Sequence, residues 1–218
     1  MQRKIPEYIK FPLVLTAVAV ISAVLLAGMY LLTLPATKAE AARRTDAALK
    51  VVFPEADRFD LKRARVEGRP FEFRVASRGA EELGYVAVGQ ATGYSSVLRV
   101  MVGMDLAFNI RGVEILYQNE TPGLGDKVTE IKSTRTWWSV LTGTGPDESN
   151  LRPWFQLQFD GKIAPVKVDK DGGRIEAITG ATISSRAVCQ AVNEAVENIR
   201  KAVRGSVSAV MREVVVRG

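Results

Sequence analysis

The run Phe11–Leu34 constrains this chain more than any other feature, because it holds no charged residue and is rich in Leu, Val and Ala. A helix needs roughly 20 such residues to cross the hydrocarbon core of a bilayer. The run is too long for the apolar region of a signal peptide, and Ala36–Ala39 is a poor cleavage site. A core helix of a soluble domain rarely stays uncharged over such a length. We therefore expect one uncleaved transmembrane helix.

The rest of the chain divides around this helix. We expect a polar N-terminus at residues 1–10, the transmembrane helix at 11–34, a helical stalk at 35–54 that Pro54 ends, and one soluble domain at 55–218. The positive-inside rule does not decide the orientation, because basic residues flank both ends of the apolar run. They are Arg3, Lys4 and Lys10 on one side and Lys38, Arg43, Arg44 and Lys50 on the other.

Composition excludes several kinds of chemistry. The chain has no histidine, which rules out Ser-His-Asp and Cys-His nucleophiles and His-ligated zinc or haem. Its one cysteine, Cys189, falls on the apolar face of a predicted helix and is expected to be a buried thiol. The net charge of +6 comes from basic residues interleaved with acidic ones, so we expect no nucleic-acid partner. No metal site is expected, because histidine is absent and one cysteine alone cannot hold an iron–sulfur cluster. Redox chemistry here would need an organic cofactor.

Four segments are predicted to be strands of an antiparallel meander, because they alternate or are mostly apolar and have glycine-containing connections. They are Phe71–Val75, Gly84–Ala91, Val97–Met104 and Gly112–Tyr117. The charged stretch from Phe53 to Arg69 is interpreted as the domain boundary. Further strands are expected at Trp154–Phe159 and around Val166 and Val168.

Helices are predicted to pack on this sheet. Val128–Leu141, with Trp137 and Trp138, is expected to be a short helix followed by a polar turn at Thr142–Asn150. From Arg186 onward, small apolar residues recur on one narrow face, as in a helix that packs closely on a sheet, and Gly205 is a plausible end. Val207–Val216 fits either a last strand or an apolar tail. The predicted fold class is α+β: one transmembrane helix, then a largely antiparallel sheet domain with packed helices.

Two motifs could build a ligand site. In Glu120-Thr121-Pro122-Gly123-Leu124-Gly125, a Pro-Gly turn exposes backbone N–H groups that could form a wall for a flat ligand. A plain connecting turn is the alternative. In Glu176–Ser185, Gly180 can adopt positive φ and Ser184 or Ser185 can cap a helix whose N-terminus, near Thr182, suits a phosphate. An ordinary helix cap is the alternative there.

Both motifs resemble those of FMN-binding domains that carry FMN as a phosphoester on threonine. Thr179-Gly180-Ala181-Thr182 is similar to the [S/T]-G-A-T motif, and Glu120–Gly125 matches the E-T-P-G-L-G loop. Phe155–Lys162 resembles an aromatic-Q-F-x-G-K stretch of the same family. The chain departs at Glu176, where the family usually has Asp, and at Gln118, where it often has His. Within the family the chain resembles the G subunits of Rnf-type ion-translocating ferredoxin:NAD⁺ oxidoreductases, which are related to the C subunits of sodium-translocating NADH:quinone reductases.

The resemblance implies covalent FMN on Thr182, attached by a separate flavin transferase. It implies a relay role in electron transport rather than acid–base catalysis, with other membrane subunits as partners and as the path for the ions. The FMN-binding domain, residues 55–218, would lie on the periplasmic or extracytoplasmic side of the inner membrane, on a single-pass anchor, with residues 1–10 in the cytoplasm. The cofactor-binding residues would be Thr179, Gly180, Ala181, Thr182, Ser184, Ser185, Glu120, Thr121, Gly123, Leu124 and Gly125. A flavin-free structural or assembly subunit, and an FMN domain of a different membrane reductase, are the alternatives.

Overall fold

The computed structural model describes residues 7–131 and 152–217, with side-chain environments for residues 10–131 and 152–205. Residues Trp137 and Trp138, most of the helix expected at Val128–Leu141 and the turn expected at Thr142–Asn150 lie outside this range. Backbone contacts divide the chain into two compact units, Met1–Asp46 and Ala47–Gly218.

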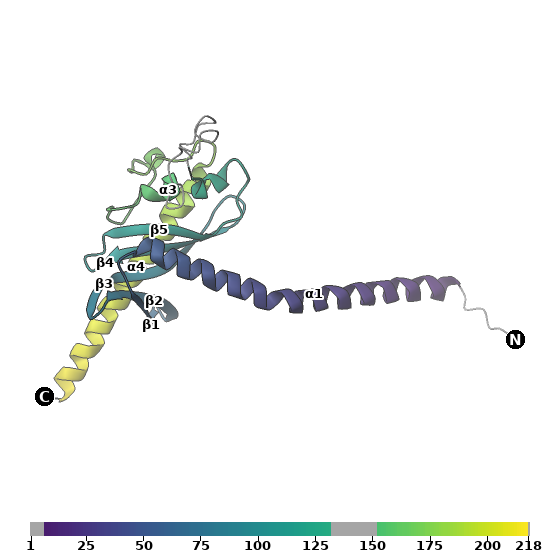
Figure 1. The fold of residues 1–218 in the computed structure, drawn as a ribbon, viewed down its shortest axis with the longest axis horizontal. Helices are drawn as coiled ribbons and strands as arrows, with labels where there is room; N and C mark the ends of the chain where they lie inside the picture. The colour runs from purple at the N-terminus through teal and green to yellow at the C-terminus, as the bar shows by residue number, and fades with distance from the viewer. Residues whose placement is uncertain (1–6, 132–151, 218) are drawn as a thin grey trace, which may run out of the picture. The chain divides into compact units, whose positions relative to one another are not determined.

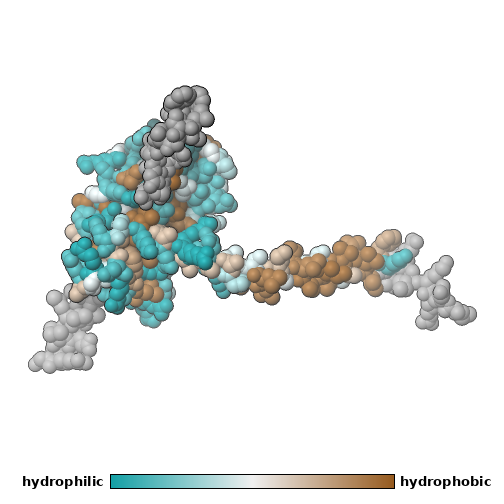
Figure 2. All heavy atoms as spheres, in the orientation of Figure 1, coloured by the Kyte–Doolittle hydropathy of each residue, from teal (hydrophilic) through white to brown (hydrophobic). Residues whose placement is uncertain are grey.

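The first unit consists mainly of one long helix, α1 (Glu7–Val52), which continues into the second unit. Its apolar part is exposed along its whole length and reaches a mean hydropathy of 2.4, which makes it long and apolar enough to cross a membrane. Figure 2 shows this surface as almost uniformly hydrophobic. Pro12 lies inside the helix, and the Thr16 hydroxyl donates a 2.8 Å hydrogen bond to its carbonyl oxygen. By length and composition, the helix is suited to anchor the chain in a membrane.

The second unit is built on one five-stranded antiparallel sheet in the order β1-β2-β3-β4-β5, a meander (Figure 1). The strands are β1 (Arg58–Val66), β2 (Arg69–Arg78), β3 (Glu81–Thr92), β4 (Val97–Asp105) and β5 (Ile110–Tyr117). The expected antiparallel sheet is therefore confirmed. Strand β1 was not predicted from the sequence, because it lies in the stretch interpreted as a boundary. As an edge strand it is mostly exposed and charged, so it lacks a clear apolar alternation.

Each face of the sheet is covered. On one face the end of α1 packs against the strands, with Leu49, Val52 and Phe53 buried beside Met101. On the other face lies α4 (Thr182–Arg217), which contacts β3 and β4. Its small residues allow the close packing that the sequence predicted: a Cβ added to Gly89 on β3 would lie 1.9 Å from the carbonyl oxygen of Ala191.

Helix α4 differs from the expectation at both ends. It begins at Thr182, four residues before Arg186, and it continues through Gly205 to Arg217 instead of stopping at the glycine. Val207–Val216, left open between strand and tail, is therefore helical. The apolar face predicted a helix here, but a glycine in open space does not end a helix by itself.

Two expected strands are wrong. Trp154–Leu157 is a short helix, α3. Phe155 and Phe159 are both completely buried, and residues four positions apart lie on the same side of a helical turn. An i, i+2, i+4 apolar pattern fits a strand equally well, but here Leu157 is exposed. The segment around Val166 forms a single bridge between Val168 and Ile175, and the backbone N–H of Val166 bonds to Asn193 at 2.7 Å.

Among the described residues, the remaining regular segments are two 3₁₀ turns, η1 (Gly125–Thr129) and η3 (Asp169–Asp171). η1 follows directly on the Glu120–Gly125 loop, and η3 lies between the Val166 segment and the start of α4. η1 contacts α4, and η3 precedes the start of α4 in the sequence.

Candidate cofactor site

The two sequence motifs meet at one cleft of about 680 Å³. This volume lies within the range of about 300–1,000 Å³ that is usual for small-molecule sites. One wall comes from the loop before η1 and the opposite wall from the first turn of α4. The lining residues are Tyr94, Glu120, Thr121, Leu124, Gly125, Gly180, Ala181, Thr182, Ile183 and Ser184.

The first wall is a tight turn. Gly123 has φ of +76°, and the backbone N–H of Leu124 donates a 3.1 Å hydrogen bond to the carbonyl oxygen of Thr121. This is the geometry expected of Pro122-Gly123 at the centre of a type II turn. The turn leaves Leu124 exposed on the cleft, while Gly123 lies outside the lining.

The Glu120 side chain connects this loop to two other segments by hydrogen bonds. Its side chain is buried, with Oε2 accepting hydrogen bonds from Ser184 Oγ at 2.5 Å and the Tyr94 backbone N–H at 3.0 Å. Oε1 accepts from the backbone N–H groups of Ser95 (3.2 Å) and Ser96 (3.0 Å) and from Ser96 Oγ (3.1 Å). Burial alone raises the pKa of Glu120, but the Ser184 and backbone hydrogen bonds outweigh it, so the pKa is lowered. Glu120 is thus an ionised residue that ties three segments of the cleft together.

The segments meet so closely around Glu120 that a side chain larger than glycine would not fit at Gly125. A Cβ added there would lie 2.5 Å from Ser184 Oγ and 2.7 Å from Glu120 Cβ. The backbone of the loop therefore rests directly on the start of α4. This contact explains why the motif needs glycine at its last position.

The second wall begins with Gly180, which has φ of +79° and turns the chain into α4. The first helical hydrogen bond runs from the Ser185 N–H to the Ala181 carbonyl at 3.0 Å. Ser185 Oγ lies inside the helix, where it accepts from the Ile178 N–H and donates to the Ala181 carbonyl, both at 3.0 Å. The expectation that Ser184 or Ser185 caps the helix is therefore wrong. The Ser185 hydroxyl instead bonds to the turn that precedes the helix, and the Ser184 hydroxyl bonds to Glu120 on the opposite wall.

Thr182, the first residue of α4, is the hydroxyl that remains available. Ser184 and Ser185 are buried and their hydroxyls are hydrogen-bonded, and Thr179 is exposed outside the cleft. Thr182 is half-buried in the cleft wall, and its hydroxyl has no hydrogen-bond partner in the part of the chain that the structure describes. The geometry thus selects one hydroxyl of the four in this segment.

Unpaired backbone donors surround this hydroxyl. Within the described residues, the N–H groups of Thr182, Ile183 and Ser184 have no acceptor, as is usual for the first turn of a helix. Together with the helix dipole they favour a negative charge at this end of α4. The arrangement can hold a phosphate group beside Thr182.

The cleft contains eight of the predicted site residues, and three others lie outside its lining. Those outside are Thr179, Ser185 and Gly123. Sequence reasoning missed two lining residues, Tyr94 and Ile183, which expose 72% and 50% of their surface. Ile183 lies inside the second motif, but no function was predicted for it from the sequence. No sequence pattern predicted Tyr94 as a site residue, because it lies far from both motifs in the sequence. It reaches the cleft through its hydrogen bond to Glu120.

The third motif, Phe155–Lys162, is hydrogen-bonded to the segment that precedes α4. Gln158 Oε1 accepts a 2.7 Å hydrogen bond from the Glu176 N–H, and Gln158 Nε2 donates to the Glu176 carbonyl at 3.3 Å. This pair of bonds fixes the backbone that leads into Thr179–Thr182. The Glu176 side chain is exposed, so its replacement of the usual Asp leaves this bracing intact.

Cys189 lies about two helical turns beyond Thr182 on α4 and takes no part in the cleft. It is buried, and burial, with the nearby negative charge of Asp171, raises the pKa of its thiol to about 12. The thiol is therefore a protonated core group rather than a nucleophile.

Comparison with known proteins agrees with this geometry. Residues 93–197, which contain every lining residue of the cleft, match the family model of the FMN-binding domain. The G subunit of the ion-translocating oxidoreductase complex of Vibrio vulnificus is 36% identical over 105 residues, which cover 48% of this chain and 43% of that protein. The chain thus aligns with less than half of this relative's length.

Two relatives align over most of their length. The G subunit of the proton-translocating ferredoxin:NAD(+) oxidoreductase complex of Clostridium ljungdahlii is 26% identical over 85% of this chain and 88% of its own. The G subunit of the ion-translocating oxidoreductase complex of Methanosarcina acetivorans is 28% identical over 88% of this chain and 95% of its own. The crystal structure of Shewanella oneidensis NqrC has a TM-score of 0.44 at 17% identity, covering 71% of this chain and 72% of that one.

Proposed function

We propose that this chain is a membrane-anchored flavoprotein subunit that carries FMN as a phosphoester on Thr182. The observation that carries the proposal is the Thr182 hydroxyl, which lies unpaired in a cleft of suitable volume beside the free N–H groups of a helix N-terminus. FMN, when bound, supplies reversible electron transfer that no side chain of this chain offers.

The residues of the cleft fit both ends of such a cofactor. The N–H groups of Thr182, Ile183 and Ser184 would compensate the charge that remains on the phosphodiester. The exposed side chains of Tyr94, Leu124 and Ile183 offer apolar surface for a flat ring. Glu120 does not face the cofactor with a free carboxylate; it holds the two walls at a fixed separation.

The apolar helix and the relatives support a role in a membrane complex. We propose that the subunit relays electrons between other membrane subunits of an ion-translocating oxidoreductase of the Rnf type. Its domain would lie on the extracytoplasmic side of the inner membrane, and a flavin transferase would attach the FMN. The ions would move through partner subunits, because the apolar run at 11–34 has no charged residue that could form a path.

The experiment is the intact mass of the full chain after co-expression with a flavin transferase. The wild-type chain should gain the mass of one FMN less one water and give a fluorescent band on a denaturing gel. Thr182→Ala should show neither signal, while Thr182→Ser should restore at least part of both. Thr179→Ala is the matched control and should be flavinylated like the wild type. A bare wild-type chain that still assembles with its partners would instead identify a structural subunit.

A further inference from the structure

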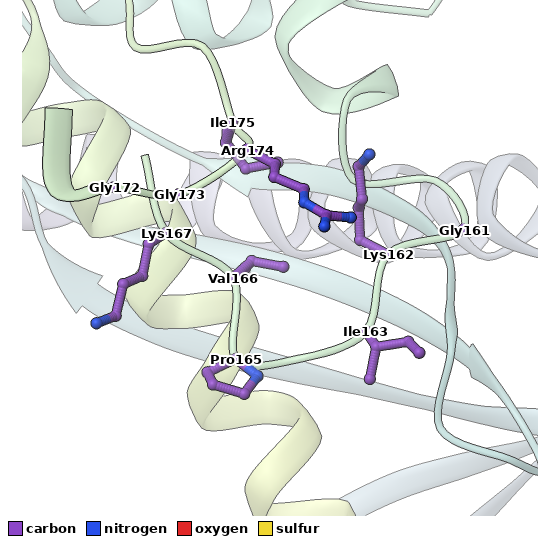
Figure 3. A pocket seen from close by; sticks show the side chains of 10 residues that line it. All are labelled: Gly161, Lys162, Ile163, Pro165, Val166, Lys167, Gly172, Gly173, Arg174 and Ile175. Atoms are coloured by element: carbon purple, nitrogen blue, oxygen red, sulfur yellow. The ribbon is translucent and has the colours of Figure 1, made fainter. Parts of the chain in front are cut away.

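A second cavity of about 460 Å³ lies on the same domain and shares no lining residue with the cofactor cleft. It is formed by the turn after α3 and by the segment that follows it, up to the strand-like bridge at Ile175 (Figure 3). The lining residues are Gly161, Lys162, Ile163, Pro165, Val166, Lys167, Gly172, Gly173, Arg174 and Ile175.

Backbone hydrogen bonds fix the walls of this cavity. The Gly161 N–H donates to the Ile110 carbonyl at 2.8 Å, and the Ile110 N–H donates to the Lys162 carbonyl at 2.9 Å. On the other wall, the Gly173 N–H donates to the Val168 carbonyl at 2.8 Å. The floor is apolar, since Val166 and Ile175 are buried. The cavity is therefore a preformed feature of the domain rather than a gap between loose side chains.

The charge of the lining is entirely positive. Lys162, Lys167 and Arg174 line the cavity, no acidic residue does, and none of the three forms an ion pair with any described residue. Figure 3 shows the Arg174 side chain extending toward Lys162, while Lys167 points away on the opposite side. Two cations directed at one space repel each other unless an anion lies between them.

Three of the four carboxylates between Asp160 and Glu176 are engaged elsewhere, and the fourth, Glu176, is exposed and forms no ion pair with a described residue. Asp160 pairs with Arg152 at 2.6 Å, and Asp171 pairs with Arg186 at 2.6 Å. Asp169 Oδ1 accepts hydrogen bonds from the backbone N–H groups of Lys170 (2.8 Å) and Ala177 (3.1 Å). The pKa of Asp171 is lowered by its hydrogen bond from Arg186 and also by the charges of Arg186 and Lys167, so Lys167 is partly compensated. No described carboxylate forms an ion pair with Lys162 or Arg174.

We propose that this cavity docks a carboxylate-bearing segment of a partner protein. The planar guanidinium of Arg174 matches a carboxylate with two parallel hydrogen bonds, and Lys162 adds a second donor on the same side. The rim favours a protein over a small anion, because Ile163, which is 63% exposed, offers an apolar contact beside the charges. An apolar contact flanked by arginine is typical of protein interfaces. The docking site does not depend on the cofactor on Thr182.

The test places a photo-crosslinking residue, p-benzoylphenylalanine, at Ile163 of the full chain in its native membrane. Mass spectrometry then identifies the crosslinked peptide. The charge-reversal pair Lys162→Glu with Arg174→Glu is compared with Arg65→Glu and Arg69→Glu. The latter two arginines are exposed on β1 and β2 and undergo the same charge change. The neutral pair Lys162→Gln with Arg174→Gln and the thermal unfolding of each variant separate loss of docking from loss of folding.

The expected result is an adduct with one protein segment that contains Asp or Glu. Its yield should fall at least tenfold in the charge-reversal pair, fall less in the neutral pair and stay unchanged in the control pair. Reversing the acidic residues of that segment to lysine should restore the adduct with Lys162→Glu and Arg174→Glu. Adducts with lipid alone, adducts with a segment that lacks carboxylates, equal loss in the control pair, or no adduct would each overturn the proposal.

Discussion

Ser184 Oγ on the first turn of α4 donates a 2.5 Å hydrogen bond to Glu120 Oε2, joining residues that are 64 positions apart in the sequence. Through this bond the loop wall and the helix wall of the cleft share one buried carboxylate. The remaining lone pairs of that carboxylate are taken by the turn at Tyr94–Ser96. Three segments of the chain are therefore joined at one carboxylate beside Thr182, and none of these hydrogen bonds uses the Thr182 hydroxyl.

Replacing Glu120 should destabilise the domain strongly. Glu120→Ala leaves the buried Ser184 hydroxyl and three partly buried backbone N–H groups without their acceptor. The loss should be roughly 2–4 kcal/mol in the free energy of unfolding, and Glu120→Gln should lose less because its amide oxygen still accepts. Denaturant unfolding of the full chain in detergent, followed by tryptophan fluorescence, measures both. Equal stability of Glu120→Ala and the wild type would show that the carboxylate does not hold the walls.

The same carboxylate predicts a pH dependence. The pKa of Glu120 in the folded chain is lowered from its ordinary value of 4.5, so the folded state binds its proton less readily than the unfolded state does. The stabilisation is therefore fully present above pH 4.5 and is lost as the pH falls through the lower, folded-state pKa. The stability difference between wild type and Glu120→Gln should shrink in that acidic range. A difference that stays constant from neutral pH to strongly acidic pH would contradict this assignment.

Gly125 should not tolerate a methyl group. In Gly125→Ala the new Cβ would lie 2.5 Å from Ser184 Oγ and 2.7 Å from Glu120 Cβ, so the loop must move off the helix. We expect a loss of roughly 1–3 kcal/mol and a lower yield of flavinylated chain. Unfolding midpoints and the flavin-to-protein absorbance ratio give the two readouts. Wild-type values for both would mean that the walls are less tightly joined than described.

Gly205 should behave in the opposite way. It lies inside α4 with no atom near the position of a Cβ, so alanine adds helix propensity without a clash. Gly205→Ala should stabilise the chain by about 0.5–1 kcal/mol, measured by thermal unfolding. If α4 ended at this glycine in a left-handed turn, the same substitution would destabilise the chain.

The parts of this fold that the sequence could predict are those with a strong local pattern. The uncharged run at 11–34, the alternating strands and the small-residue face of α4 each bury or expose one kind of surface, so composition and periodicity reveal them. The edge strand β1 and the helix at Trp154–Leu157 were missed because their local patterns are ambiguous. β1 has no fully buried face, and the spacing of Phe155 and Phe159 suits a strand and a helix equally.

The candidate site divides in a similar way. The two motifs could be recognised from their residues, and the structure brings them to one cleft. The roles of Ser184, Ser185 and Glu120 could not be recognised, because each depends on a partner that is distant in the sequence or on where the helix begins. Tyr94 joins the cleft because its turn is hydrogen-bonded to Glu120 and to the neighbouring residues Asn119 and Thr121, contacts that no local pattern predicts.

The measurement that tests the central claim most directly is fragmentation of the flavin-bearing peptide. Cleavage after Arg174 and Arg186 releases Ile175–Arg186, which carries the hydroxyls of Thr179, Thr182, Ser184 and Ser185 on one peptide. Tandem mass spectrometry of this peptide from the flavinylated full chain should place the FMN phosphoryl mass on Thr182 and on no other residue. The same mass on Thr179, Ser184 or Ser185, or on a different peptide, would contradict the account.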